Sequence, residues 1–133
     1  MPHLKNKSET NTEAARLLHS RNLYPSAIHS AYYACLQIVK HIIIKESPKT
    51  PSEVEDEIKT SPESTHEYLI NRLTISLRED GKDYKTFNNN INQLKKLRVE
   101  SDYSNVLSDS SKSKNSLDLN EIIIKHLKAI YKT

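Results

Sequence analysis

The sequence of 133 residues contains a single glycine, Gly81, and no tryptophan. Tight hairpins, phosphate-cradling loops and β-bulges depend on positive φ angles, which glycine adopts at the lowest cost. We therefore expect neither a β-sheet nor a Walker-type loop nor a dinucleotide-binding turn. The length fits one domain that is large enough to bury a hydrophobic core.

Cysteine, net charge and long apolar runs are also scarce. The only cysteine, Cys35, cannot form a disulfide within the chain. The net charge is +3, from 20 basic and 17 acidic residues, and this surplus is too small to indicate nucleic-acid binding by itself. Residues 1–11 are polar rather than a signal peptide, and no apolar run has membrane length. We expect a cytoplasmic protein without membrane association.

Helical periodicity is what the sequence has in abundance, and it is strongest between Pro25 and Lys45. Proline suits the first position of a helix, and Pro48 indicates the other end, because the residue before a proline avoids helical geometry. The segment is predicted to be the central buried helix, with Cys35 as a small core residue. Its apolar residues recur at steps of three and four, as one helix face requires: Ile28, Ala31, Tyr32, Cys35, Ile38, Val39, Ile42 and Ile43.

The region before the central helix predicts a helical hairpin. Residues 1–9 are polar and are expected to be disordered. Thr10 and Glu13 have the spacing of a capping box, which predicts a helix from Thr10 to about Asn22. Because residues 23–24 leave room only for a tight connection, this helix should pack antiparallel to the central one.

Start and stop signals divide the remainder into further helices. Thr50 begins a segment of one or two turns, Ser61-Pro62 begins another that Gly81 ends, and a third covers residues 84–103. Residues 104–116 are expected to be a flexible loop, after which Ser116 or Asp118 caps a last helix. The sequence therefore predicts an all-α, up-and-down bundle of four to five helices within one domain, residues 10–133.

The histidines do not have the spacing of a metal site. His19, His41, His66 and His126 include no pair three to five residues apart, and no second cysteine could assist them. We expect neither a metal ion nor a cofactor. His29 lies one turn before a pair of tyrosines on the central helix, and a partly buried packing residue is the expected role.

Two short patterns lie in different helices. One is a paired Tyr-Tyr-Ala behind a short turn, and the other is an Arg-x-x-x-Asp-Tyr near the end of a later helix. The residues are Tyr32, Tyr33 and Ala34 in the first pattern and Arg98, Asp102 and Tyr103 in the second. In this order, over roughly residues 12–131, the chain resembles the HEPN superfamily of small helical-bundle proteins.

The resemblance implies a homodimer. It also implies, for active members, a metal-independent ribonuclease site in which four to six residues separate an arginine from a histidine. After Arg98 the corresponding positions are Tyr103, Ser104 and Asn105, and none is a histidine. Imidazole transfers protons near neutral pH, whereas a tyrosine with a pKa of about 10 does not readily do so. We therefore expect a dimeric, non-catalytic binding module. The resemblance also implies a partner such as a minimal nucleotidyltransferase in a toxin–antitoxin or defence setting.

Three alternatives remain open. The first is a divergent ribonuclease in which Arg98, with Asp102 and Tyr103 of both subunits, binds the scissile phosphate of RNA. The second is a nucleotide-binding regulator that uses Arg98 with Lys95 and Lys96. The third is an adaptor unrelated to the family, in which Arg98 points into solvent and only pairs with Asp102 along the helix.

Overall fold

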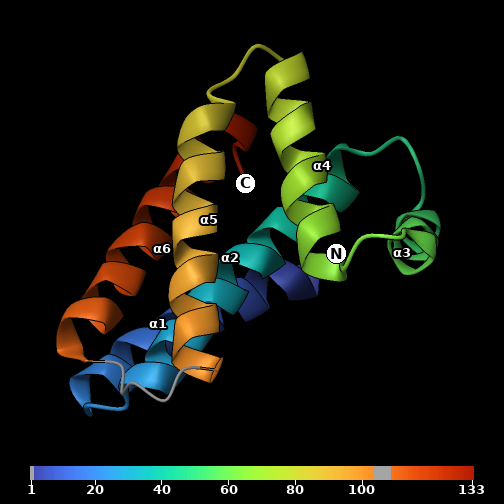
Figure 1. The fold of residues 1–133 in the computed structure, drawn as a ribbon. Coiled ribbons are helices and arrows are strands. Elements are labelled where there is room, and N and C mark those ends of the chain that lie inside the picture. The colour runs from blue at the N-terminus through green and yellow to red at the C-terminus, as the bar shows by residue number, and fades with distance from the viewer. Residues whose placement is uncertain (1, 104–108) are drawn as a thin grey trace.

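The computed structural model describes residues 2–103 and 109–133, which contain helices and no strands (Figure 1). The all-α prediction is confirmed, but the expected number of four to five helices is too low, because the segment after Thr50 forms a full ten-residue helix. The six helices of the described residues are α1 (Pro2–Ser20), α2 (Tyr24–Glu46), α3 (Pro51–Thr60), α4 (Thr65–Glu79), α5 (Tyr84–Tyr103) and α6 (Ser110–Tyr131).

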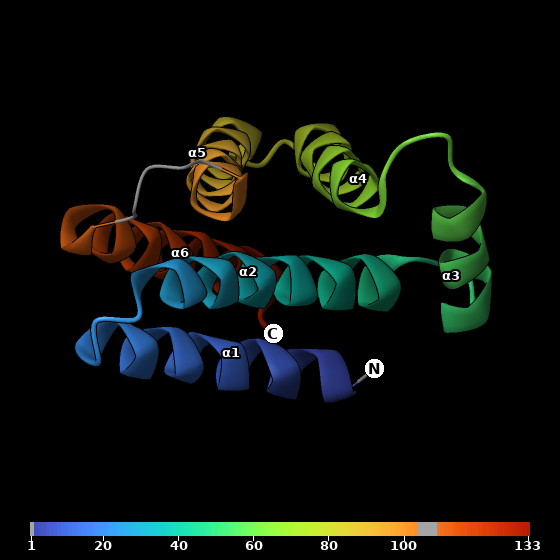
Figure 2. The ribbon, with the colours of Figure 1, turned by 60° about the horizontal axis from the view of Figure 1, so that its bottom comes forward.

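Helix α2 is the element on which the others are organised. Helices α1, α4, α5 and α6 all pack against it, and Figure 2 shows three layers, with α1 on one side, α2 and α6 in the middle, and α4 and α5 on the other side. Helices α1 and α2 form the predicted antiparallel hairpin. Helices α4 and α5 are seen nearly end-on in this view, so they cross α2 steeply instead of continuing a simple up-and-down arrangement.

The hydrophobic core follows the apolar face predicted for α2. Cys35 is fully buried there, as expected, and burial raises the pKa of its thiol well above the ordinary value, so it remains protonated. Besides α2, each of α3 to α6 contributes to this core. The main contributors are Val54 and Ile58 of α3, Leu69, Ile70, Leu73 and Leu77 of α4, Phe87, Ile91 and Leu94 of α5, and Leu119, Ile123 and Leu127 of α6.

Several helix ends agree with the sequence prediction. Thr50 and Glu53 form the expected capping box at the start of α3. Gly81 ends α4 with a φ of +69°, and the Lys82 N–H donates to the Leu77 carbonyl at 2.8 Å. Helix α4 begins later than predicted, because Ser64 caps it by accepting a hydrogen bond from the Glu67 N–H.

The N-terminal region differs from the prediction. Helix α1 begins at Pro2, so most of the segment that was expected to be disordered is helical, and Thr10 does not cap it. Ser8 is buried and donates a hydrogen bond to the Ala34 carbonyl at 2.7 Å. The Asn11 amide donates to Gln37 at 2.7 Å. These polar contacts attach α1 to α2, and a polar sequence can therefore form an ordered helix here.

The start of α6 also differs. Asp109, rather than Ser116 or Asp118, is the N-cap, so the predicted loop 104–116 is helical from Ser110 onward. Residues 104–108 of that loop lie outside the described residues. Ser113 and Ser116 are buried, and Ser113 forms a 2.7 Å hydrogen bond with His19 of α1. The serines that suggested a loop are therefore small packing residues.

Candidate functional site

Arg98 lies on α5 and is directed towards α2. Its Nε is 3.0 Å from Asp102 Oδ2, which is the predicted ion pair, and its Nη2 donates to the Tyr33 hydroxyl at 3.4 Å. The guanidinium carbon is 5.7 Å from the ring centroids of both Tyr32 and Tyr33, a cation–π arrangement. Only 15% of the Arg98 side chain is exposed, so it does not point into solvent as the unrelated-adaptor alternative requires.

The residues of the Tyr-Tyr-Ala pattern have different surroundings. Tyr32 is fully buried, while Tyr33 is half-buried and meets it edge to face, with ring centroids 5.8 Å apart. Ala34 is buried beside α1, where its carbonyl accepts the Ser8 hydrogen bond. Burial raises the pKa of Tyr32 well above its ordinary value and Arg98 opposes this, so Tyr32 remains a neutral phenol.

Two histidines complete the arrangement. His66, from the first turns of α4, lies edge-on to Tyr32 and Tyr33 at centroid distances of 5.5 and 5.4 Å. His29 lies 4.4 Å from the Tyr33 ring, and its Nδ1 is 3.7 Å from Asp102 Oδ2. We call the group of six residues the Arg98 cluster: His29, Tyr32, Tyr33, His66, Arg98 and Asp102.

Sequence reasoning missed His66 in this cluster and expected His29 to be more buried than it is. His66 was considered only for metal spacing, and it reaches Arg98 because α4 and α5 both cross α2. A contact between separate helices has no signal in local sequence. His29 was expected to be partly buried, but 48% of its side chain is exposed.

The surroundings of His66 in the cluster lower the pKa of its imidazole. Burial lowers its pKa, and the positive charge of Arg98 lowers it further, followed by smaller contributions from Lys95 and His29. His66 is therefore neutral near pH 7. Its ring can exchange a proton when the local charge changes.

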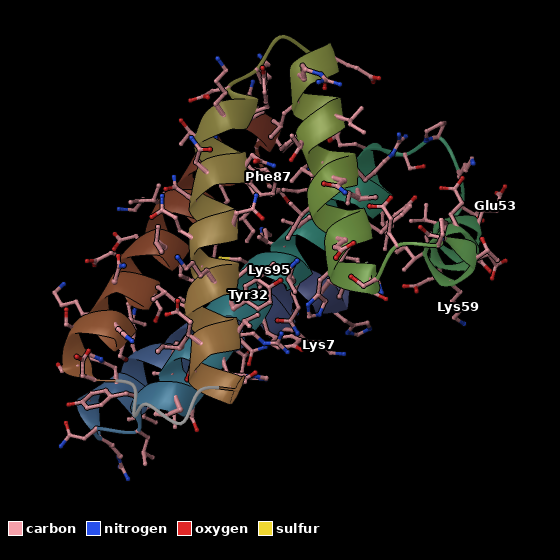
Figure 3. All side chains as sticks on the ribbon, in the orientation of Figure 1. Lys7, Tyr32, Glu53, Lys59, Phe87 and Lys95 are labelled. Atoms are coloured by element: carbon pink, nitrogen blue, oxygen red, sulfur yellow. The ribbon has the colours of Figure 1, made fainter. Side chains whose placement is uncertain are left out.

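The other predicted site residues, Lys95, Lys96 and Tyr103, do not all lie at the Arg98 cluster. Lys95 is half-buried and its charge acts on His66, and Figure 3 labels it near Tyr32 where α5 crosses α2. Lys96 is outside the Arg98 cluster, because it borders a cavity of about 230 Å³ together with Asn115 of α6. Tyr103 ends α5, and its side chain lies outside the described residues.

Solvent reaches the Arg98 cluster at its His29 edge. An open cavity of about 250 Å³ lies there and is bordered by His29 and Asp102 together with residues from the start of α2. The remaining lining residues are Pro25, Ser26 and Ser30. The cavity therefore gives solvent access to Asp102 of the ion pair, whereas Arg98 lies behind its lining residues.

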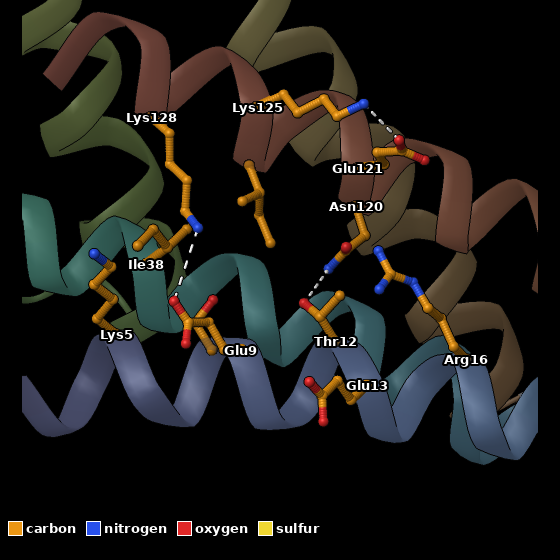
Figure 4. Close-up of a pocket in the computed structure, with 12 residues that line it drawn as sticks. Lys5, Glu9, Thr12, Glu13, Arg16, Ile38, Asn120, Glu121, Lys125 and Lys128 are labelled. Atoms are coloured by element: carbon orange, nitrogen blue, oxygen red, sulfur yellow. Dashed lines mark hydrogen bonds and ion pairs between the residues drawn. The ribbon is translucent and has the colours of Figure 1, made fainter. Parts of the chain in front are cut away.

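A second cavity, of about 340 Å³, lies between α1, α2 and α6 (Figure 4). Its rim carries charges of both signs, and these are partly paired, since Lys128 is 3.9 Å from Glu9 and Lys125 is 2.7 Å from Glu121. Buried Asn120 forms part of the floor. Charges of both signs around this rim favour neither an anion nor a cation.

Within residues 2–103 and 109–133, no group of three or more His, Cys, Asp or Glu side chains is arranged to hold a metal ion. The described helices also include none with the length and apolar character needed to cross a bilayer.

Comparison with known proteins gives one family. Neither the curated proteins nor the solved structures include a match to this chain. The family model described as the HEPN domain matches residues 1–130 of the 133-residue chain, and the all-helical fold agrees with this match. The chain therefore belongs to the HEPN domain family.

Proposed function

We propose that this HEPN protein is a binding module, without catalytic turnover, whose Arg98 cluster binds a phosphate group of RNA or of a nucleotide. The orientation of Arg98 carries the proposal. A largely buried guanidinium is held by Asp102 and by Tyr33 from another helix, and Asp102, its ion-pair partner, borders an open cavity together with His29. The planar guanidinium matches phosphate geometry, and a side chain that is already fixed loses little entropy on binding.

The direct test is the affinity for a fluorescently labelled hexauridylate, measured by anisotropy. Replacing Arg98 by alanine should weaken binding about 10- to 100-fold, because hydrogen bonds to a charged group contribute about 1.5–3 kcal/mol each. Arg78→Ala is the matched control, since it removes the same charge from an exposed position at the far end of α4. Equal affinities of the two variants would contradict the proposal.

The same titration with a nucleoside triphosphate separates two forms of the proposal. Binding of the triphosphate and not of hexauridylate would favour the nucleotide-binding regulator over an RNA-binding module. In both cases Arg98→Ala should lose the affinity and Arg78→Ala should retain it.

A second candidate function, a divergent metal-independent ribonuclease, is favoured by one specific observation. His29 and His66 bring two imidazoles to the Arg98 cluster, although the motif itself lacks the histidine. Imidazole is the side chain best suited to proton transfer near neutral pH. Hexauridylate should then be cleaved by the wild type in excess EDTA and left intact by Arg98→Ala, whereas the binding-module proposal expects no cleavage by either.

We also propose that the protein is a homodimer and that the interface includes the end of the molecule that carries the Arg98 cluster. Family membership supports the dimer. Exposed apolar side chains support the location, because Val99, 38% exposed, directly follows Arg98, and Leu23 directly precedes α2. An interface of this kind would bring two copies of the cluster together.

Light scattering at micromolar concentration should therefore give twice the mass of one chain. Val99→Glu should shift the protein to the monomer, because an unpaired carboxylate in an apolar interface is costly to desolvate. Gln93→Glu adds the same charge at an exposed position of α5 and should leave the dimer intact. A monomeric wild type would contradict the proposed dimer.

For the protein partner we propose a minimal nucleotidyltransferase in a toxin–antitoxin or defence setting. Membership in the HEPN family supports this partner class.

A further inference from the structure

We propose that His66 is a further ligand-binding residue of the Arg98 cluster and that it takes up a proton when an anion binds there. This inference rests on the proposed function, because it concerns the same phosphate site. It adds a residue from a third part of the chain and makes the affinity for the anion depend on pH.

The geometry brings His66 and Arg98 to the same pair of rings. The His66 ring is 5.5 Å from Tyr32 and 5.4 Å from Tyr33, and the Arg98 guanidinium carbon is 5.7 Å from each. The two side chains come from α4 and α5, which are adjacent helices. Arg98 and His66 therefore flank the same pair of tyrosines, and the charge of Arg98 acts on the His66 ring. An anion that binds the guanidinium on this side would face the imidazole as well.

The hydrogen bonds of His66 leave one ring nitrogen for a ligand. Its Nδ1 is 3.4 Å from the Tyr32 hydroxyl, whereas its Nε2 has no hydrogen-bond partner among the described residues. A tyrosine hydroxyl can donate to a neutral imidazole or accept from an imidazolium. Tyr32 can thus hold His66 in both protonation states, with Nε2–H as the donor to the anion.

The proton comes from solvent and binds to Nδ1 of His66, and no other covalent bond changes. The charged and titratable groups near His66 are Tyr32, Tyr33 and His29 from α2 and Lys95 and Arg98 from α5. In the free protein, burial and the neighbouring cations lower the pKa of His66. A bound anion offsets those cations and raises the pKa, so binding and protonation favour each other.

The sign of the pH effect follows from this linkage. Between the pKa of His66 in the free protein and its higher pKa in the complex, binding takes up a proton, and affinity falls as pH rises. Below the free-state pKa the ring is already protonated, and above the bound-state pKa it remains neutral, so the dependence levels off at both ends.

The test measures hexauridylate affinity at constant ionic strength between about pH 5.5 and pH 7.5, a range in which phosphodiesters and uracil do not titrate. Uptake of one proton changes affinity by at most about tenfold per pH unit, and we expect the wild type to bind about five- to tenfold more weakly at the upper pH. His66→Gln should remove this dependence. His126→Gln, which removes a histidine from α6, should keep it.

A direct measurement covers the case in which His66→Gln does not fold. The NMR titration of the His66 ring protons should show a higher pKa with saturating hexauridylate than without it. An unchanged pKa, or a pH dependence that disappears in His29→Gln instead, would overturn the inference while the phosphate site stands. Absence of binding even at the lowest pH would overturn both the inference and the proposed function.

Discussion

Replacing Phe87 by alanine is expected to lower the free energy of unfolding by about 3–5 kcal/mol. Phe87 is fully buried in the core that α5 shares with α2 and α4. Its removal loses the transfer free energy of the ring and leaves a cavity that the surrounding helices fill only in part. Urea denaturation followed by helical circular dichroism measures this loss.

Ile75→Ala is the matched control for Phe87→Ala. Ile75 is an apolar residue of α4 with 36% of its surface exposed, so its truncation should cost less than about 1 kcal/mol. Similar losses for the two variants would show that the core around Phe87 is not well packed.

Asn120→Asp is the second substitution with a large expected effect. Asn120 of α6 is 2% exposed, and its amide nitrogen donates to the Ala31 carbonyl at 2.9 Å. A carboxylate has no hydrogen to donate there and would be a buried charge facing a carbonyl oxygen. We expect a loss of about 3–5 kcal/mol in unfolding free energy at neutral pH, as for other buried unpaired charges.

The loss from Asn120→Asp should depend on pH with a defined sign. Burial raises the folded-state pKa of the new carboxyl above its unfolded value of about 3.9, so the folded state holds the proton more tightly. The penalty is therefore largest above the folded-state pKa and decreases as pH falls towards the unfolded-state value. The protonated acid also regains an O–H donor for the Ala31 carbonyl.

Urea titrations at about pH 4.5 and pH 7 measure this dependence. Asn115→Asp, at an exposed position of α6, is the control and should change stability little at either pH. A loss for Asn120→Asp that is the same at both pH values would contradict the expected burial of the new carboxyl.

The parts of the fold that local sequence determines were predictable. The apolar period of α2, the Thr50 capping box and the Gly81 helix end each depend on residues a few positions apart. Family resemblance added Arg98 and Asp102, and their ion pair is also local, one turn apart on α5.

Interactions between distant segments were not predictable. Ser8 and Ser113 look like residues of disordered segments, and only their hydrogen bonds to Ala34 and His19 explain why they lie in helices. His66 likewise approaches Arg98 through the crossing of separate helices, which no local period encodes. The errors around Ser8 and Ser113 and the omission of His66 therefore have the same physical origin.

The Arg98–Asp102 pair has a consequence for how such proteins diverge. Both partners belong to α5, so the pair does not join one helix to another. The apolar residues of α2 and their neighbours, rather than the Arg98 cluster, provide most of the stability of the fold. A substitution beside this arginine should consequently cost the fold little, so the chemistry of the cluster and the stability of the scaffold can change independently of each other.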